Sequence, residues 1–273
     1  MPNVRCTAAT TPFVGCRSPS VRVGSQISKC VQYEGALFNF LAAFTSPGNV
    51  VLTEPLTYPG IKAAAAYTGV RLVGVPIDEK GTIPDELDSA CRQHAPRAVY
   101  LIPTIDNSTT ATMPLSRRKE VAEILRHKVL LFEDDAYRKL EPNAVPLASL
   151  VPERTHFRCE PFQVHRARAA GVPSPNARPS VRRGLVSALP ASVQMPAFPM
   201  VPLFTRWLQD GSTDAIIGAI LNEAPARQRL AADVLVQHAY SRHPNGHPIW
   251  VLCHAIGVRR NSRRMFKGNG WLS

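Results

Sequence analysis

Three consecutive acidic residues follow a short apolar run in this 273-residue chain. Glu133, Asp134 and Asp135 come directly after residues 129–132, which have the pattern of a strand. Carboxylates this close together repel one another, so the cluster is costly unless a cation compensates the charge. By itself the pattern fits either a solvated loop or a magnesium site, because Mg²⁺ prefers oxygen ligands.

Two further polar loops follow apolar strand patterns upstream. Residues 102–112 (IPTIDNSTTAT) contain Asn107, and residues 54–60 (EPLTYPG) contain Tyr58. Taken separately, the first loop fits a surface turn and Tyr58 fits ordinary aromatic packing. Chemistry at these positions depends on whether the fold brings the three loops to one place.

The elements that position these loops alternate in type. That alternation predicts right-handed crossovers and a mainly parallel α/β sheet, whose ligands lie at the carboxyl ends of the strands. We expect strands over 49–53, 70–75, 98–102 and 129–132, and helices over 35–44, 61–67, 84–94 and 115–127. A second block offers a short element at 204–208, a helix over 215–236 broken or kinked near Pro225, and a strand starting at 247–251.

In this order and spacing, the three loops resemble those of class I aminotransferases. The similarity is greatest to the branch that includes the aminotransferase-like domain of MocR/GntR-type regulators, and it covers 35–155 well and 191–250 more loosely. It implies a three-layer α/β fold, the large domain of a fold type I aminotransferase, followed by a truncated small domain.

The resemblance also implies a cofactor, pyridoxal 5′-phosphate, and a role for each loop. Asp134 matches the aspartate that pairs with the protonated ring nitrogen, so the ring can accept electrons released at the substrate α-carbon. Asn107 and Tyr137 match the residues that hydrogen-bond the 3′-oxygen, and Tyr58 matches the aromatic residue that stacks on the ring. Members of this family move an amino group from an amino acid to a 2-oxo acid and work as homodimers.

Two features depart from the family pattern. The small residues of the phosphate loop would fall at Gln32 and Tyr33, and the Schiff-base lysine that should follow Tyr137 is missing. No lysine occurs between Lys139 and Lys267. Without that amine the chain lacks the covalent anchor for the cofactor and the general base for the α-proton. We therefore assign no catalytic residue and predict an inactive pseudoenzyme.

Three segments carry the basic charge of the chain. Residues 1–34, 154–190 and 251–273 have net charges of +3, +6 and +5, which together exceed the +12 of the whole sequence. They also hold five of the six cysteines, and 154–190 is rich in proline and shows no apolar period. The expected organisation is a degraded N-terminal segment at 1–34, a cofactor-binding large domain at 35–153 and an anomalous, out-of-frame segment at 154–190. The end of the large domain and the start of the small domain follow at 191–250, and an anomalous tail at 251–273.

A shifted reading frame explains these segments. Codons that encode residues 161–171 permit Leu-Ser-Lys-Cys-Ile-Ala when read one base later, and the lysine codon would overlap those of Gln163 and Val164. In the other shifted frame, the codons of residues 252–257 permit Leu-Pro-Arg-Asn-Trp. Our hypothesis is that 154 to about 187 and 252–273, with part of 1–34, are translated out of the ancestral frame.

Composition bears on the remaining classes of protein. No apolar run is long enough to span a membrane and the first 20 residues lack a secretory pattern, so we expect a cytoplasmic protein. The cysteines form no C-x-x-C pair, which argues against zinc and disulfide frameworks. Two non-enzymatic alternatives stay open: the sensor domain of a MocR/GntR-type regulator, although 1–34 is too short for a winged-helix domain, and a nucleic-acid-binding protein, which rests on the charge alone.

Overall fold

The computed structural model describes residues 33–126, 129–151, 156–159, 172–173, 206–207, 209–235 and 240–251. Three segments, 1–34, 154–190 and 252–273, lie mostly outside the described residues, and Gln32 is among the residues left out. The structure therefore does not test the reading-frame hypothesis, which concerns these segments.

A six-stranded sheet forms the centre of the α/β domain. The first five strands in spatial order run parallel to one another, and the sixth pairs antiparallel with the fifth at the edge. This arrangement confirms the mainly parallel sheet. The spatial order is β2 (Arg71–Gly74), β1 (Val50–Thr53), β5 (Ala98–Leu101), β6 (Leu130–Asp134), β7 (His156–Cys159) and β8 (Val172–Pro173).

The strands β7 and β8 correct one expectation. The sequence of 154–190 shows no strand periodicity, yet 156–159 pairs in register with β6. An exposed strand offers unpaired N–H and C=O groups to any neighbouring segment, so backbone pairing does not require an apolar pattern.

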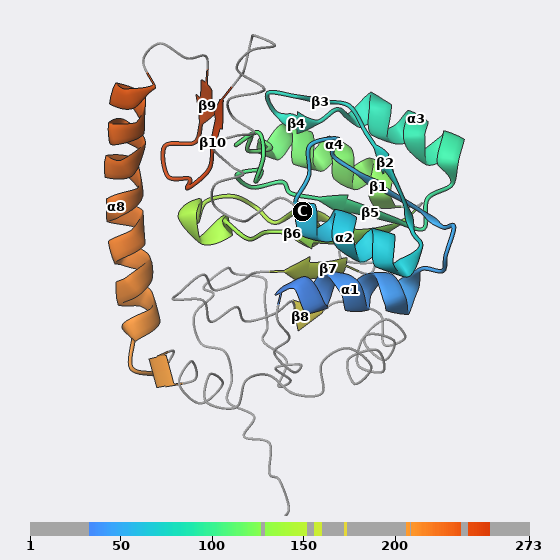
Figure 1. The fold of residues 1–273 in the computed structure, drawn as a ribbon, viewed down its shortest axis with the longest axis horizontal. Coiled ribbons are helices and arrows are strands. Elements are labelled where there is room, and N and C mark those ends of the chain that lie inside the picture. Colours follow the sequence, from blue (N-terminus) through green and yellow to red (C-terminus); the bar gives the residue numbers. More distant parts are fainter. Residues whose placement is uncertain are drawn as a thin grey trace, which may run out of the picture.

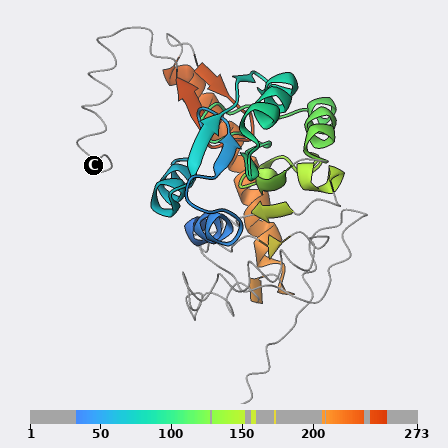
Figure 2. The ribbon, with the colours of Figure 1, turned by 90° about the vertical axis from the view of Figure 1, so that its right-hand side faces the viewer.

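Helices cover both faces of this sheet and complete three layers (Figures 1 and 2). One layer contains α1 (Tyr33–Phe44) and α2 (Pro59–Thr68), and the other contains α3 (Pro84–His94), α4 (Leu115–Arg126) and α5 (Leu147–Leu150). All four expected helices of the first block are present, and α3 has the expected bounds. Pro84 at its first turn and Asp85 and Glu86 beside the positive end of the helix dipole account for that clear start.

Alternation along the strands builds the two halves of the core. Val51, Tyr100 and Phe132 pack with residues of α1 and α2, whereas their chain neighbours Leu52, Leu101 and Leu131 pack against the α3 and α4 side. Both sets are fully buried. Near-continuous apolar strands are what a parallel sheet covered on both faces requires.

The second block forms one long helix and a hairpin. The helix α8 (Ser212–Val234) runs through Pro225, so of the two expected outcomes the break is wrong and the kink stays a prediction. An interior proline removes one backbone hydrogen bond and crowds the preceding turn, which permits a kinked helix to continue. A pair between Arg227 and Glu223 spans the position at 2.9 Å. The hairpin consists of β9 (Tyr240–Arg242) and β10 (Ile249–Val251). No described helix is long and apolar enough to cross a membrane.

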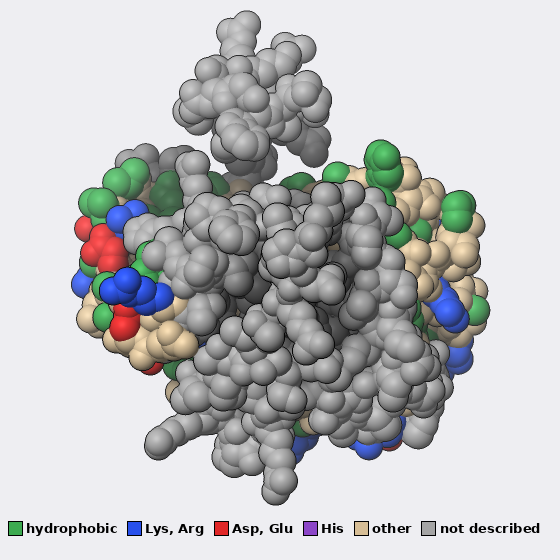
Figure 3. All heavy atoms as spheres, turned by 90° about the horizontal axis from the view of Figure 1, so that it is seen from below, with side chains coloured by type: hydrophobic (Ala, Val, Ile, Leu, Met, Phe, Trp, Pro, Cys, Tyr) green, Lys and Arg blue, Asp and Glu red, His purple; other side chains and the backbone are tan. Residues whose placement is uncertain are grey.

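Charges on the visible face of α8 are mixed in sign. Figure 3 shows Lys and Arg side chains beside Asp and Glu over this helix. A second pair of this kind, Arg206 with Asp210 at 3.9 Å, precedes the helix. This part of the described surface therefore lacks the one-sign character of a nucleic-acid footprint.

A buried arginine fixes the loop that leaves β5. Arg118 of α4 is 1% exposed, and its guanidinium donates to the carbonyl oxygens of Pro103, Met113 and Val145 at 2.6–2.9 Å. It also donates to Oγ1 of Thr104 at 3.0 Å. The planar fork of donors thus joins both ends of the 103–113 loop to the segment that precedes α5.

We expect Arg118→Lys to lower the free energy of unfolding by about 3 kcal/mol, because one ammonium cannot satisfy several buried carbonyl groups in this geometry. Urea unfolding of the full chain measures the change. The matched control is Arg92→Lys, whose side chain is 67% exposed and pairs only with Asp88. Equal midpoints for the two variants would show that Arg118 does not hold the loop.

Candidate functional site

The first two acids of the cluster belong to strand β6, which extends to Asp134 and not only to Phe132 as expected. Pairing with β7 accounts for the extension, since Glu133 and Asp134 are both in register with residues of that strand. Consecutive strand residues point to opposite faces, so the carboxylates of Glu133 and Asp134 are directed apart.

Glu133 serves the α5 side of the sheet. Its two carboxylate oxygens accept hydrogen bonds from the backbone N–H groups of Leu147 and Ala148 at 2.7 and 2.8 Å. These are donors in the first turn of α5, which have no partner within the helix. Glu133 is therefore a helix-capping residue, and its negative charge is compensated without a metal.

Asp134 lies on the opposite face and is 2% exposed. Its Oδ2 accepts a hydrogen bond from the hydroxyl of Tyr100, and its Oδ1 accepts one from the N–H of Ala136 at 3.3 Å. Burial raises the pKa of the Asp134 carboxyl to about 8, the Ala136 N–H opposes that rise, and the charge of Asp135 adds to it. A buried carboxyl in this state gains most from a cationic partner.

Asp135 pairs with Arg138 at 3.5 Å, in the short 3₁₀ helix η1 (Arg138–Leu140). The three acids of the cluster thus have separate hydrogen-bond or ion-pair partners. Among the residues that the structure describes, no group of three or more His, Cys, Asp or Glu side chains could hold a metal ion. The magnesium interpretation loses its basis there, because the three carboxylates do not converge.

Asn107 and Tyr137 lie together beside this strand end. The Tyr137 hydroxyl donates to Oδ1 of Asn107 at 3.1 Å, which joins the loop after β5 to the turn after β6. The loop has an unusual backbone, with φ of 51° at Ile105 and 66° at Thr110. Three hydrogen bonds to Oδ1 of Asp106, from Ser108 and Thr109, hold this conformation in place.

Tyr58 precedes α2 on the same face of the sheet as Asp134. Its half-buried ring packs against the core cluster that contains Tyr100 and Phe132. A Cβ atom at Gly60 would lie 2.2 Å from Cε1 of Tyr58, so this ring position requires glycine there. Asp134 is thus the last residue of β6, and Tyr58, Asn107 and Tyr137 lie in the loops that follow the carboxyl ends of β1, β5 and β6.

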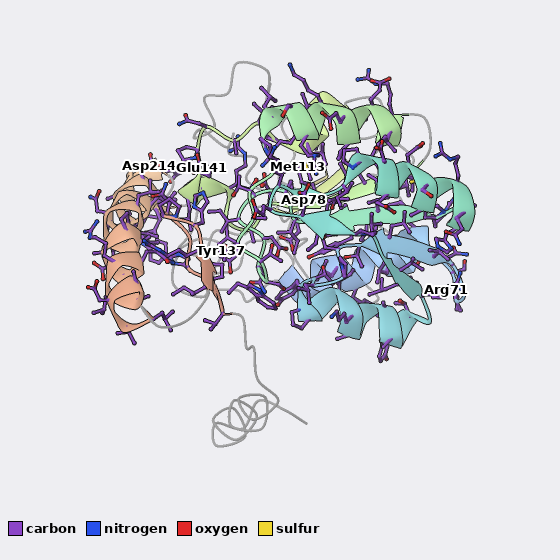
Figure 4. The ribbon with its side chains drawn as sticks, turned by 90° about the horizontal axis from the view of Figure 1, so that it is seen from above. Arg71, Asp78, Met113, Tyr137, Glu141 and Asp214 are labelled. Atoms are coloured by element: carbon purple, nitrogen blue, oxygen red, sulfur yellow. The ribbon has the colours of Figure 1, made fainter. Side chains whose placement is uncertain are left out.

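The hairpin turn between β9 and β10 adjoins these residues. The rings of His247 and Tyr137 are 6.1 Å apart and nearly perpendicular, and His243 lies 3.5 Å from Glu141. Gln228 of α8 donates to the carbonyl of Gly246 at 2.7 Å. Figure 4 shows Tyr137 and Glu141 on the side of the domain toward α8, away from Arg71 at the start of β2. Partial burial lowers the pKa of both histidines, so both favour the neutral form.

Two residues of this region were not identified from the sequence. Tyr100 is in an apolar strand pattern, where a tyrosine fits simple packing, and its bond to Asp134 follows only from the β5–β6 register. Glu54 is 3% exposed and accepts from the backbone N–H of Ile102 and from Thr82 at 3.2 and 3.4 Å. Burial, reinforced by the charge of Asp106, raises the pKa of Glu54 to about 8.

The residues described here fit the pyridine ring of the family cofactor but not its covalent attachment. A buried carboxyl at a strand end suits a protonated ring nitrogen, and the Asn107–Tyr137 pair suits a ring oxygen. The sequence after Tyr137 supplies no lysine before Lys267 except Lys139 in η1. The Tyr33 side chain of the phosphate loop is outside the described part. Fold and site together define a protein of the fold type I aminotransferase class.

Comparisons with known proteins agree with this class. The family model "Aminotransferase class I and II" matches residues 7–160. The chain belongs to this family, whose cofactor is pyridoxal 5′-phosphate.

The similar proteins include both enzymes and regulators. The uncharacterized HTH-type transcriptional regulator YdeF of Bacillus subtilis is 32% identical over 123 residues, 44% of this chain and 27% of the relative. The 2-aminoadipate transaminase of Thermus thermophilus is 30% identical over 144 residues, 52% of this chain and 35% of that enzyme. The chain thus matches about a third or less of each of these relatives.

Solved structures show the same fold. LysN, the α-aminoadipate aminotransferase of Thermus thermophilus, complexed with N-(5′-phosphopyridoxyl)-L-leucine, superimposes with a TM-score of 0.74 at 25% identity. The similarity covers 86% of this chain and 63% of LysN.

The raised pKa of Glu54 predicts a pH dependence. Its folded pKa of about 8 exceeds the ordinary value of 4.5, so the folded state binds more protons between these values. The free energy of unfolding therefore falls as pH rises from about 5 to 8. We expect Glu54→Gln, which mimics the protonated acid, to flatten this decline in urea unfolding measured across that range. Glu79→Gln, at an exposed turn, is the control; the same slope in Glu54→Gln and the parent chain would contradict the assignment.

Proposed function

We propose that this chain is an aminotransferase-type protein that keeps the ring-binding half of a pyridoxal 5′-phosphate site and does not carry out amino transfer. The observation that supports the ring-binding half most directly is the joint position of Asp134 and the Asn107–Tyr137 pair. A carboxyl with a raised pKa and a linked amide and phenol occur at adjacent strand ends. No simple packing requirement explains why these polar groups should be gathered there.

Each residue has a defined task in this proposal. Asp134 pairs with the protonated ring nitrogen, and the bound cation in turn stabilises the ionised carboxylate. Asn107 and Tyr137 supply the hydrogen bonds to the ring oxygen, and Tyr58 packs on the ring face. When bound, the cofactor supplies an electron sink to the α-carbon of an amino acid.

The missing amine separates binding from reaction. In the family, a lysine holds the cofactor covalently and moves the α-proton, and here 161–171 stands where that lysine is expected. Under the reading-frame hypothesis the lysine codon is present in the nucleotide sequence but read in another frame. Family members with this lysine convert an amino acid and a 2-oxo acid; this copy is a pseudoenzyme. We also propose that this chain is cytoplasmic and that family members with the lysine are homodimers.

Purified full-length chain mixed with pyridoxal 5′-phosphate should show no amino transfer. A panel of amino acids with 2-oxoglutarate, analysed for product by mass spectrometry, measures this. Borohydride treatment followed by peptide mapping should find no stoichiometric cofactor on a single residue. Turnover, or one fully labelled lysine, for example Lys139, would overturn the proposed inactivity.

Non-covalent binding should persist. We expect the chain to bind pyridoxamine 5′-phosphate, which cannot attach covalently, and Asp134→Asn to weaken this binding at least about tenfold through loss of the charge-assisted bond. Calorimetry measures the affinity, and Asp85→Asn, at an exposed helix terminus, is the control. Equal affinities in both variants would show that Asp134 does not hold the ring.

Nucleotide sequencing tests the reading-frame hypothesis independently. The gene and transcript around codons 150–195 should contain the family lysine motif one base out of the present frame. A close, expressed relative with the same 154–190 peptide in its own frame would refute the hypothesis.

A second candidate is a sensor module of the MocR/GntR type. The similarity to YdeF favours it, as does the contact of the β9–β10 turn with Tyr137, through which a ligand at the site could act on α8. Hydrogen exchange with and without pyridoxamine 5′-phosphate distinguishes the candidates. Greater protection of 212–251 on binding supports a sensor, and unchanged protection there contradicts it.

A further inference from the structure

Tyr100 is a buried residue that contacts Asp134, the carboxylate proposed to pair with the ring nitrogen. It is 0% exposed on β5, and its hydroxyl donates to Oδ2 of Asp134. The parallel register places Tyr100 beside Phe132, and the two rings are 5.4 Å apart. Asp134 is the next residue on the same face of β6, so the tyrosine ring reaches it along the strand.

The ring of Tyr100 is surrounded by apolar side chains. The ring lies in an apolar cluster with Phe132, which in turn packs edge-on against Phe40 at 4.8 Å. A phenylalanine would fill this space without bringing a polar atom into the core. Burying a hydroxyl costs free energy unless it is hydrogen-bonded, and Asp134 provides the partner.

We propose that Tyr100 is a positioning residue for Asp134: its hydroxyl fixes the carboxylate and favours the ionised form that pairs with a cationic ring nitrogen. This inference rests on the proposed ring-binding function of Asp134. A hydrogen bond donated to the charged form of an acid stabilises that form. In this proposal the Tyr100 hydroxyl acts against burial, which is the largest cause of the raised pKa of Asp134.

The aromatic cluster gives this bond its direction. Phe40, Phe132 and Tyr100 are all fully buried or nearly so, and the tilted and edge-on contacts among them restrict rotation of the tyrosine ring. A carboxylate held by a hydroxyl on a restricted ring loses little further conformational entropy when a ligand binds. Tyr100 thus acts on the ligand only through Asp134.

The direct test follows the ionisation of Asp134 in the ligand-free, full-length chain. Infrared difference spectra over a pH series, with Asp134→Asn to assign the carboxyl band, give its midpoint. Tyr100→Phe should move the midpoint to higher pH. Tyr67→Phe, whose side chain is 83% exposed, should leave it in place. An unchanged midpoint in Tyr100→Phe would overturn the proposal.

Ligand binding gives the second test, with two probes. Tyr100→Phe should weaken pyridoxamine 5′-phosphate roughly tenfold, the usual cost of losing a hydrogen bond to a charged group. An analogue with C–H in place of the ring nitrogen should bind the parent and Tyr100→Phe alike. Equal weakening of both probes would assign Tyr100 to packing alone and overturn the proposal. If the parent chain binds neither probe, the proposed function fails, and the infrared titration still decides the role of Tyr100.

Discussion

The alternation of side chains along a buried strand controls this site. In β6, adjacent carboxylates leave the strand on opposite faces, so a cluster that looks repulsive in the sequence is divided among separate partners. Glu133 caps α5, Asp134 bonds to Tyr100, and Asp135 pairs with Arg138. Only Asp134 is thereby left on the face where Tyr58 packs, and burial there gives it the character expected of a partner for a cation. A one-residue change of register would exchange the roles of Glu133 and Asp134.

The loops around this strand are held by polar groups within the core. Arg118 joins three backbone carbonyls, and Asp106 organises the turn that carries Asn107. Glu54 adds a buried acid whose raised pKa keeps it protonated near neutral pH, which limits repulsion with Asp106. The residues expected to bind the ring are therefore supported by groups that have no contact with a ligand in the proposed function. In the proposed function, residues within 58–137 bind the ring, whereas the family lysine is expected within 161–171. Binding of the ring can therefore persist in a chain that has lost the lysine.

Much of the fold of 33–151 was predictable because strand and helix patterns are local. The parallel sheet, the four helices and the order of the three loops follow from apolar periodicity and from turn residues such as Gly69. The strand β7 was not predictable, because it depends on backbone pairing with β6. A break of α8 at Pro225 was one of two expected outcomes and is wrong, since the propensity of a single residue does not include the hydrogen bonds of the turns on either side. The family model assigns the family, and the individual site residues remain predictions.

The amino-acid sequence by itself determined the family resemblance, the four expected ring-binding positions and the absence of a lysine between Lys139 and Lys267. These depend on residue identity and order, which need no coordinates. Only the tertiary structure showed that Glu133 and Asp134 have separate partners, that Tyr100 contacts Asp134, and that Arg118 and Glu54 support the loops. Those contacts join residues that are far apart along the chain, and strand register and burial determine both their partners and their pKa values.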